Sequence, residues 1–486
     1  MIRTIPLVAA TLLSVKNELK SYRNYSDEQK SAHDTSKTFA TRRIPSIICV
    51  GAAGIDAVGM ISSFPKPDDK IRTSSLTLAG GGNAANTCSA ISKLGITASI
   101  FSRVGADVNG QLVISQLQAD GVQTDLIDIA PNDCPTMFTF VMVDASTSSR
   151  TCISTVIKEE LSPAAAHSLA QRFHNFNPSS SSTALVHFDS RHTAAALQLA
   201  QEITTANGPI LTIDVEKDRP PHLHNLLPLC HIVFSNEHFA SNYLPSTTLQ
   251  SGILSCILYP DRTPTSSKHC NQSLDERREL LELDGDEESG EILMKKVMTL
   301  RQLFRNSQAR VVVSTMGAKG CVLLRRRVYS IGDEKTSLMA MLRSRIPAII
   351  RSDGDETTQE IDLQALKKVE KQLFVHRKYL LQDGDEEFDV LRLSASKVTP
   401  SDQIVDTTGA GDAFIGGFLV ALLAQQQQLL SFQHQKETEN EAEDELVLML
   451  RCAEVGSLVA AVSLRGLGAR AAQPTVKQLN SLLRGS

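Results

Sequence analysis

A carboxylate follows directly on a run of small residues near the carboxyl end of the chain. Residues 405–418 read Val-Asp-Thr-Thr-Gly-Ala-Gly-Asp-Ala-Phe-Ile-Gly-Gly-Phe, with a predicted turn at Gly409, Ala410 and Gly411 and a helix opened by Asp412. A helix N-terminus that follows glycine offers unpaired N–H groups and the positive end of the helix dipole, which together bind an anion. Aspartate suits this place if the anion is a phosphoryl group in transfer and Asp412 accepts the proton of the attacking hydroxyl. The alternative is an ordinary aspartate in a first helical turn.

Two amides stand three residues apart in the segment Gly80-Gly-Gly-Asn-Ala-Ala-Asn86. The glycines allow a ligand to approach the backbone closely, and a helix is predicted over residues 83–94. Asn83 and Asn86 then point to the same side of that helix, where each amide can donate to and accept from the vicinal hydroxyls of a sugar. Asp56, which follows the first predicted strand, could bind another pair of hydroxyls. Asn83 could instead be no more than the N-cap of its helix.

A third segment, Ser314-Thr-Met-Gly-Ala-Lys-Gly320, reads as a strand and a glycine turn, followed by a second strand over residues 321–324. It could cradle a nucleotide phosphate, or it could be a plain hairpin. Three nucleotide-binding signatures are missing from the sequence: the P-loop motif, the protein-kinase motifs and the G-x-G-x-x-G of dinucleotide-binding folds. The sequence therefore argues against those three classes of protein.

The composition narrows the range of partners. The 486 residues include 49 Lys+Arg and 54 Asp+Glu, which gives a net charge of −5 and no basic excess to hold a nucleic-acid backbone. Trp is absent and aromatic residues make up 5% of the chain, so few side chains could stack on bases. No apolar run approaches the roughly 20 residues that span a bilayer. We expect a soluble protein that binds neither nucleic acid nor a membrane.

The cysteines and the N-terminal residues bear on location. Nine cysteines are spread along the chain without a C-x-x-C pair, which argues against a zinc site or disulfide framework and favours a reducing compartment. Residues 1–43 do not read as core, and we expect a disordered tail or a targeting segment there. The expected location is the cytoplasm, with an organelle reached through this tail as the alternative.

Buried strands alternate with helices from Ile47 onward, which predicts an α/β fold with a mainly parallel sheet covered on both faces. Strands are expected at residues 47–50, 97–101, 137–143, 151–157, 184–188, 210–214, 231–234 and 310–314, and a helix at 193–205. Residues 241–306, 325–397 and 425–445 interrupt this rhythm with acidic or Gln-rich runs, and we interpret them as solvated surface loops. Their Asp-Gly-Asp motifs do not fit an EF-hand loop, so no metal site built from protein ligands alone is predicted.

Taken together and in this order, these segments resemble the pfkB family of ribokinase-like carbohydrate kinases. Gly81-Gly-Asn with Asn86 is similar to the N-terminal signature of that family, and Asp406-Thr-Thr-Gly-Ala-Gly-Asp412 is similar to its C-terminal signature. The spacing of Val50-Gly-Ala-Ala-Gly-Ile-Asp56 and Phe64-Pro-Lys-Pro-Asp68 is similar to that of the ketohexokinase (fructokinase) branch. The resemblance covers residues 46–240, 310–324 and 398–470.

The resemblance implies a three-layer α/β/α sandwich over residues 44–486, with a small β-sheet lid built mainly from residues 56–80 and 134–157. It implies transfer of the γ-phosphoryl group of ATP to a sugar hydroxyl, and in the ketohexokinase branch the sugar is a ketohexose such as fructose. The implied cofactors are Mg²⁺, bound with the nucleotide, and a monovalent cation. The implied partner is a second copy of the chain, paired through the lid.

The resemblance also implies a role for each matching residue. Asp412 would be the catalytic base, beside an anion hole formed by Gly409, Ala410 and Gly411. The sugar hydroxyls would be held by Asp56, Gly82, Asn83 and Asn86. ATP would lie along Thr315, Gly317 and Gly320, and Arg150 would approach its phosphates.

One family motif is incomplete in this chain. Many members carry N-x-x-E for the magnesium-water network, whereas Asn236-Glu-His-Phe239 lacks the final Glu; Glu237 and Glu216 are the substitutes at hand.

Two alternative functions are compatible with the sequence. A ribokinase or nucleoside kinase of the same family is one alternative, and a non-catalytic kinase-like scaffold is another. The paired amides favour a polyhydroxyl substrate, and the intact Gly-Ala-Gly-Asp element favours catalysis.

Overall fold

The structure of the chain is a computed structural model. It describes residues 46–175, 183–239, 256–260, 293–327, 361–433 and 441–485, apart from internal gaps of one or two residues. The predicted tail at residues 1–43 lies outside the described residues, as do most of residues 241–306 and all of residues 328–360.

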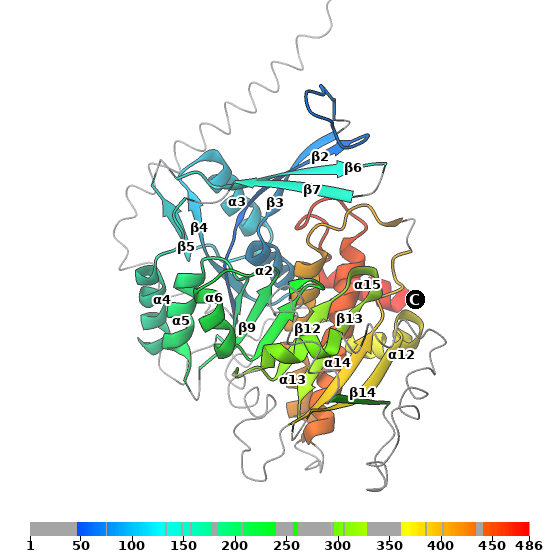
Figure 1. The fold of residues 1–486 in the computed structure, drawn as a ribbon. Helices are drawn as coiled ribbons and strands as arrows, with labels where there is room; N and C mark the ends of the chain where they lie inside the picture. Colours follow the sequence, from blue (N-terminus) through cyan, green and yellow to red (C-terminus); the bar gives the residue numbers. More distant parts are fainter. Residues whose placement is uncertain are drawn as a thin grey trace, which may run out of the picture. The chain divides into compact units, whose positions relative to one another are not determined.

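Within the described residues, eleven strands form one sheet. Seven of them pair in parallel: β1 (Ile47–Val50), β4 (Ala98–Gly105), β5 (Ile127–Ala130), β8 (Leu185–Phe188), β9 (Ile210–Val215), β10 (Ile232–Ser235) and β12 (Val311–Thr315). Four antiparallel strands complete one edge: β11 (Cys256–Pro260), β13 (Cys321–Arg326), β14 (His376–Asp383) and β15 (Glu386–Leu393). The strand order is β11-β14-β15-β13-β12-β10-β9-β8-β1-β4-β5, so the predicted mainly parallel sheet is confirmed (Figure 1).

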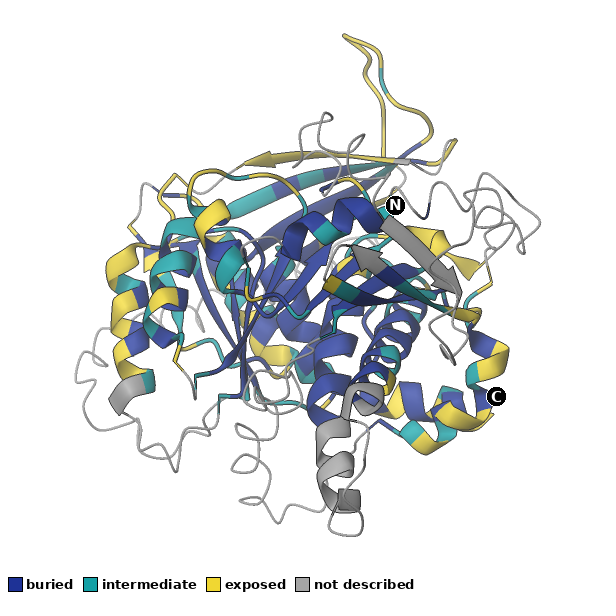
Figure 2. Ribbon diagram, turned by 60° about the horizontal axis from the view of Figure 1, so that its bottom comes forward, coloured by how far each residue is buried: buried dark blue, intermediate teal, exposed yellow. Residues whose placement is uncertain are grey.

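Helices cover both faces of this sheet. Strand β1 shows why, because Ile47 and Cys49 enter one apolar cluster while Ile48 and Val50 enter the other. The first cluster is shared with α2 (Asn83–Lys93), α3 (Val108–Ala119), α12 (Leu363–Leu373), α13 (Ala410–Gln433), α14 (Glu441–Ser463) and α15 (Val476–Gly485). The second is shared with α4 (Pro163–Asn175), α5 (Thr193–Ile203), α6 (His222–Leu226) and the short turns η1 (Leu227–Leu229) and η5 (Gln302–Phe304). The predicted three layers follow, with the central strands buried throughout (Figure 2).

A second sheet of four strands forms the lid that the sequence predicts. Its order is β3-β2-β6-β7, with β2 at Gly54–Ile61, β3 at Ser75–Gly81, β6 at Met137–Asp144 and β7 at Ser149–Thr155. On each face of this sheet, paired residues of neighbouring strands form rows across the strands. One row on the outer face consists of Leu78, Ala57, Phe140 and Ile153. Asp56 and Arg150 belong to the opposite face.

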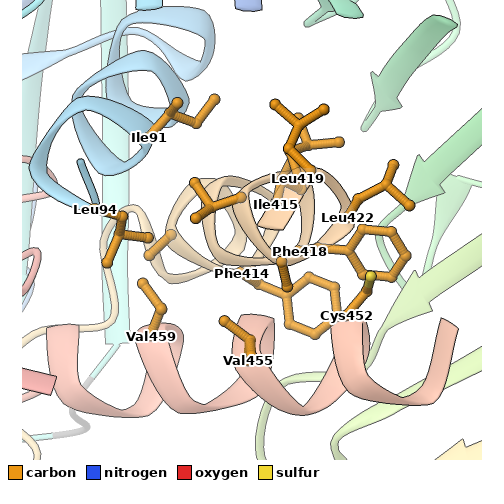
Figure 3. Packing of buried hydrophobic residues seen from close by; sticks show 14 of the residues in the cluster. Ile91, Leu94, Phe414, Ile415, Phe418, Leu419, Leu422, Cys452, Val455 and Val459 are labelled. Carbon is orange, nitrogen blue, oxygen red and sulfur yellow. The ribbon is translucent and has the colours of Figure 1, made fainter. Parts of the chain in front are cut away.

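Small residues allow helix α13 to pack closely between α2 and α14 (Figure 3). A Cβ added at Gly416 would lie 2.5 Å from the Cβ of Ala90 in α2, and one added at Gly417 would lie 2.8 Å from a methyl group of Val459 in α14. Phe414 and Phe418 fill the rest of the α13–α14 interface. The close approach brings the N-terminus of α13 beside that of α2, and both carry predicted site residues.

The interpretation of residues 325–397 as a surface loop is wrong for their described part. Residues 361–393 form α12, β14 and β15, and these strands extend the large sheet beyond β13. The acidic residues misled the prediction because Asp383 ends β14 and pairs with Glu386 at the start of β15, while Phe388 and Val390 further along β15 are buried.

Residues 425–445 are likewise not a loop throughout. Helix α13 continues through the glutamines to Gln433, and α14 begins at Glu441. Gln and Leu are good helix formers, so a polar run of this kind can continue a helix beyond its buried part. In residues 241–306, β11 pairs with β14, and Val297 and Leu300 are buried in the core, so that stretch is not wholly surface either.

One described helix is long and apolar enough to cross a membrane by length and composition, the stretch Glu445–Ser463 of α14. It is not an unbroken apolar run in the sequence, because Arg451 and Glu454 interrupt the stretch. Most of it is buried inside the protein against α13, as expected of a core helix (Figure 3).

Candidate active site

The residues predicted to form an anion hole lie at the N-terminus of α13. The helix begins at Ala410 rather than at Asp412, and the Gly409 carbonyl accepts the first helical hydrogen bond, from the N–H of Ala413 at 2.8 Å. Gly409 has φ +73°, a conformation that favours glycine. The first N–H groups of a helix have no partner within it, so those of Gly411 and Asp412 are available to an anion. A Cβ added at Gly411 would meet nothing within 4 Å, which leaves open space for such a ligand.

Helix α2 directs its amides toward carboxylates. Its N-cap is Gly82, with φ +92°, so the alternative of Asn83 as the N-cap is wrong. The Nδ2 group of Asn86 donates to Oδ2 of Asp412 at 2.8 Å, while the Asn83 side chain hydrogen-bonds to Asp214. The buried Oδ1 atom of Asn86 has no partner in the described structure. The two predicted sugar-binding amides are therefore fixed at one end, and Asn86 keeps an acceptor for a ligand.

Asp56 reaches the same region from the lid strand β2. Its carboxylate packs over Gly81, where a Cβ would lie 2.2 Å from Oδ1. Burial raises the pKa of Asp56, and the positive charge of Arg470 opposes that rise. The side chain also hydrogen-bonds to Thr139 of strand β6. Asp56 is also close enough to raise the pKa of Asp412, and its contact with a sugar stays a prediction.

The carboxylates of the site raise one another's pKa. Burial raises the pKa of Asp412 well above the ordinary carboxyl value, and the negative charge of Glu216 raises it further. Burial also raises the pKa of Asp214 well above its usual range, again with help from Glu216 and Asp412. Such mutual repulsion favours a bound cation or a proton. A carboxylate with a raised pKa can act as a general base near neutral pH.

Four further residues of the site region stand at the carboxyl ends of parallel strands. Asp189 follows β8, Glu216 follows β9, Asn236 follows β10 and Thr315 ends β12. Ligands of open α/β sheets bind at this edge of the sheet. The topology therefore gathers residues that are more than a hundred positions apart in the chain.

The β12–β13 connection is a hairpin, as one of the two interpretations expected. The N–H of Met316 donates to the Gly320 carbonyl at 2.8 Å, and the turn between them holds Gly317 and the short η6 (Gly317–Lys319). Lys319 pairs with Glu237 at 3.6 Å, which links this turn to the segment after β10. A Cβ added at Gly317 would enter open space, so room for a nucleotide remains. The described structure gives no direct contact between this turn and Asp412, so the ATP-binding roles of Thr315, Gly317 and Gly320 stay predictions.

Arg150 reaches the anion-hole turn from the lid. Its Nη1 donates to Oγ1 of Thr407 at 3.0 Å and of Thr408 at 3.3 Å, just before Gly409. The predicted approach to the ATP phosphates stays a prediction, but the guanidinium stands beside the loop that would bind them. The contact joins strand β7 of the lid to the large domain.

The incomplete N-x-x-E motif has a structural counterpart. Asn236 accepts from the N–H groups of His238 and Phe239 at 3.1 and 2.7 Å and donates to the Glu216 carbonyl at 3.3 Å. Phe239, in the place of the missing Glu, is buried in the core. Asn236 therefore stabilises the loop that follows β10. Among the neighbouring carboxylates, Glu216 raises the pKa of Asp412 the most.

Asp189, Asp214 and Arg470 also lie in the site region, although no sequence motif marks them. Asp214 interrupts an apolar strand, which is the one local signal that could have marked it. Arg470 donates to the Gly54 carbonyl at 3.2 Å, and burial lowers its pKa to about 10. Its guanidinium fills the space beside Gly80, so it contacts both strands at the base of the lid.

The segment after α14 contacts three parts of the site. The N–H of Gly468 donates to Asp406 at 2.9 Å, and Ala469 packs on Gly409. Further along, Nε2 of Gln473 donates to the Asn86 carbonyl at 2.9 Å. With Arg470 at the lid base, these contacts hold the anion-hole turn, the lid and helix α2 in one arrangement.

The residues present fit an anionic nucleotide carrying a divalent cation. The open space at Gly411 lies at a helix N-terminus, where a phosphoryl group can be held. Among the described residues, no group of three or more His, Cys, Asp or Glu side chains is arranged to hold a metal ion. A divalent cation would therefore have to arrive with phosphate oxygens among its ligands.

Comparison with known proteins identifies a family. The model of the pfkB family carbohydrate kinases matches residues 45–247 and 355–476, more than half of the chain. The second range includes α12, β14 and β15, so these elements are part of the matched family domain.

Solved structures show the same fold. The ribokinase of Arabidopsis thaliana complexed with ribose and ATP is 18% identical with a TM-score of 0.51, over 91% of this chain and 100% of that chain. The ribokinase from Giardia lamblia is 15% identical with a TM-score of 0.54, again over 91% and 100% of the two chains. The predicted ribokinase-like α/β fold is confirmed.

Sequence relatives match over shorter segments. A candidate 1-phosphofructokinase of Mycoplasma pneumoniae is 31% identical over 100 residues, 18% of this chain and 33% of that protein. A nucleoside kinase of Methanocaldococcus jannaschii is 37% identical over 65 residues, 13% of this chain and 22% of that protein. The chain thus spans a third or less of the length of these curated relatives.

Proposed function

Because the chain belongs to the pfkB family of carbohydrate kinases, we propose that it transfers the γ-phosphoryl group of ATP to a hydroxyl of a sugar, and that the sugar is a ketohexose such as fructose. The observation that carries this proposal is the buried Asp412 at the N-terminus of α13, held at 2.8 Å by the Asn86 amide. A general base, an anion hole and a hydroxyl-binding amide meet at this one point.

The chemistry divides among these groups. The acceptor hydroxyl oxygen forms a bond to the γ-phosphorus while the bond from that phosphorus to the β-γ bridging oxygen breaks, and ADP leaves. The hydroxyl proton passes to the Asp412 carboxylate, whose pKa is raised by burial and by Glu216. The transition state is loose, so positioning and charge neutralisation supply most of the acceleration. The N–H groups of Gly411 and Asp412 would stabilise the transferring phosphoryl oxygens.

Metal ions complete the proposal. Mg²⁺, bound with the nucleotide, would neutralise phosphate charge, and Glu216 is the carboxylate that we assign to it. The mutually raised pKa values of Asp412 and Asp214 support a cation nearby. A monovalent cation is the further cofactor that we infer from the family.

The lid would complete the site over the sugar. Asp56 lies on its inner face and would bind the sugar hydroxyls together with Gly82, Asn83 and Asn86. Arg150 contacts Thr407 and Thr408 at the anion-hole turn, so the lid touches the loop that would bind the phosphoryl group. Exclusion of water by such a contact would limit wasteful hydrolysis of ATP.

The identity of the acceptor is the open part of this proposal. The Asn86 amide beside Asp412, the Asn83 amide beside Asp214 and the nearby Asp56 support a polyhydroxyl substrate, and the ketohexose follows from the resemblance of the N-terminal motifs to the ketohexokinase branch. The sequence match to a nucleoside kinase supports the alternative of a nucleoside acceptor.

A substrate panel tests the function. We would measure ADP release with Mg-ATP against fructose, ribose, adenosine and fructose 6-phosphate, with Asp412→Asn as the control. We expect turnover on fructose and a loss of about 10²–10⁴-fold in kcat for the variant. In the wild type, kcat/KM should fall as the pH is lowered, with a midpoint above the usual pKa range of a carboxyl group. Turnover on ribose or adenosine alone would keep the mechanism and change the substrate. ATP binding without turnover on any acceptor would instead support a non-catalytic scaffold.

We also propose a subunit arrangement and a location. Two copies would pair through the outer face of the lid, where Leu76, Leu78 and Ile153 are exposed. The seven cysteines whose side chains the structure describes are free thiols, which supports a reducing compartment such as the cytoplasm.

A further inference from the structure

Asp189 stands at the carboxyl end of β8, with its carboxylate buried and bonded only to backbone N–H groups in the described structure. Its Oδ2 accepts from Ala52 at 2.7 Å and from Ala84 at 3.0 Å. Its Oδ1 accepts from Arg191 at 2.9 Å. A carboxylate that accepts three N–H bonds is held rigidly in one orientation.

Glycine at position 51 leaves the space that this carboxylate occupies. A Cβ added at Gly51 would lie 1.9 Å from Oδ1 of Asp189, so any side chain at Gly51 would displace the acid. Helix α2 has no side-chain cap of its own, because its N-cap is Gly82. Asp189 therefore supplies, from a distant strand, the anion that stabilises the N-terminus of this eleven-residue helix.

The two N–H groups that share Oδ2 belong to different parts of the site. Ala52 lies in the connection from β1 to β2, the strand that carries Asp56. Ala84 lies in the first turn of α2, between Asn83 and Asn86. The N–H of Ala85 also donates to the Ala52 carbonyl at 3.1 Å, so the two segments are joined side by side.

We propose that Asp189 is a positioning residue of the active site, which fixes the register between the β1–β2 connection and helix α2. Its oxygens are occupied by the backbone, so it acts through Asn83 and Asn86 rather than by touching the substrate. Because Asn86 donates to Asp412, the same register also sets the orientation of the base. This inference rests on the proposed kinase function and adds to it a residue that the sequence motifs do not include.

Charge gives Asp189 a second effect. Four carboxylates act on Asp412: Glu216 after β9, Asp214 within β9, Asp56 on β2 and Asp189 after β8. Asn86 is the neutral group that faces it from α2. Removal of one negative charge from this set lowers the pKa of Asp412, so the base becomes available at lower pH.

Two variants separate position from charge. In Asp189→Asn, the side-chain carbonyl can take the place of Oδ2 and keep both bonds to Ala52 and Ala84, while the charge and the bond from the Arg191 N–H to Oδ1 are lost. Asp189→Ala removes the bonds as well. The matched control is Asp362→Asn, because Asp362 caps α12 through the N–H of Ala365 at 2.9 Å and has no contact with the site.

Steady-state kinetics on the accepted substrate, whether fructose, ribose or adenosine, is the first readout. We expect Asp189→Ala to raise the KM for that substrate about tenfold and to leave the KM for ATP nearly unchanged. Asp189→Asn should keep both KM values and shift the acid limb of kcat/KM to lower pH. An unchanged sugar KM in the Ala variant, equal damage in the Asn variant, or an unshifted acid limb would each overturn the proposal.

Hydrogen–deuterium exchange gives a readout that needs no turnover. Amide exchange at Ala52 and Ala84 should accelerate in Asp189→Ala and stay slow in Asp189→Asn and in the Asp362→Asn control. If wild type phosphorylates none of the substrates, the proposed function fails, while this exchange pattern still decides whether Asp189 joins the two segments. If the Ala variant does not fold, the Asn variant alone tests the proposal. Its KM for the sugar should then equal that of the wild type, and the acid limb of its kcat/KM profile should lie at lower pH.

Discussion

Two glycines of the anion-hole turn differ in what an added methyl group would meet. At Gly411 it would meet nothing within 4 Å, whereas at Gly409 it would lie 2.5 Å from the Cβ of Ala469, with φ at +73°. We expect Gly411→Ala to unfold at the wild-type temperature but to lose about 10²-fold in turnover, because the methyl group takes the space of the phosphoryl group.

Gly409→Ala is the comparison variant for that experiment. It should lower the free energy of unfolding by about 1–3 kcal/mol, because alanine is strained at this positive φ and its methyl group would crowd Ala469. Thermal unfolding and ADP release measured on both variants separate the two effects. Full turnover in Gly411→Ala would mean that no phosphoryl group is bound at the N-terminus of α13.

At the residue scale, the sequence identifies the groups that stand in dense motifs. Asp412 and Asn86 were both predicted as site residues, and the structure joins them directly at 2.8 Å. Asp189 and Arg470 could not be found in this way, because a single acid after a strand or a single base in a loop is common in any chain. Their roles arise only when the fold brings them to Ala84 and to the lid base.

At the element scale, a buried ionic cluster holds the antiparallel edge of the sheet to α14. Asp389 of β15 accepts from Nε of Arg325 at 2.9 Å and from Nε of Arg327 at 2.8 Å, and Arg325 also pairs with Glu445 of α14 at 3.6 Å. Burial alone would raise the pKa of Asp389, but hydrogen bonds from the two arginines bring it below its ordinary value. The carboxylate is therefore charged at neutral pH and stabilises the fold there.

We expect Asp389→Asn to lower the free energy of unfolding by about 3–5 kcal/mol at pH 7, because it leaves buried arginine charge uncompensated. A carboxyl group with a lowered pKa stabilises the fold above its unfolded-state pKa, and that stabilisation is lost as the pH falls through the folded-state pKa. Urea unfolding should show the gap between variant and wild type narrowing below about pH 4.

The control for this prediction is an ion pair with an exposed partner. Asp128 pairs with Arg103 at 3.3 Å, and the Asp128 side chain is 44% exposed. Asp128→Asn should change stability by no more than about 1 kcal/mol. If Asp389→Asn behaves like this control, the cluster does not hold the sheet edge to α14.

Elements with a strong apolar pattern were predicted close to their observed bounds. The strand expected at residues 47–50 is β1, and the helix expected at 193–205 is α5 (Thr193–Ile203). β14 and β15 were missed because their charged residues were interpreted as solvated, whereas Asp389 is fully buried among arginines. A charge pattern alone does not reveal whether the opposite charge will be brought beside it by the fold.

At the scale of the whole molecule, the outer face of the lid carries apolar side chains without cover in the described structure. Leu76 is 59% exposed, Leu78 is 52% exposed and Ile153 is 59% exposed, while Phe140 between them is half-buried. Leu78 and Ile153 stand at the two ends of one row across the four strands, a strip that also contains the buried Ala57 and the half-buried Phe140. A strip of this kind is self-complementary when two copies meet about a twofold axis.

We therefore expect the protein to be a dimer in solution and the double variant Leu78→Lys with Ile153→Lys to be monomeric. Two buried lysines would lose solvation without a partner charge, which disfavours association strongly. Light scattering after size exclusion measures the mass, and Val447→Lys, an exposed position on α14, should stay dimeric. The monomer should also show a raised sugar KM, because the lid that carries Asp56 and Arg150 would lose its support from the partner. A wild-type monomer at assay concentrations would contradict the arrangement and leave the lid to act within a single chain.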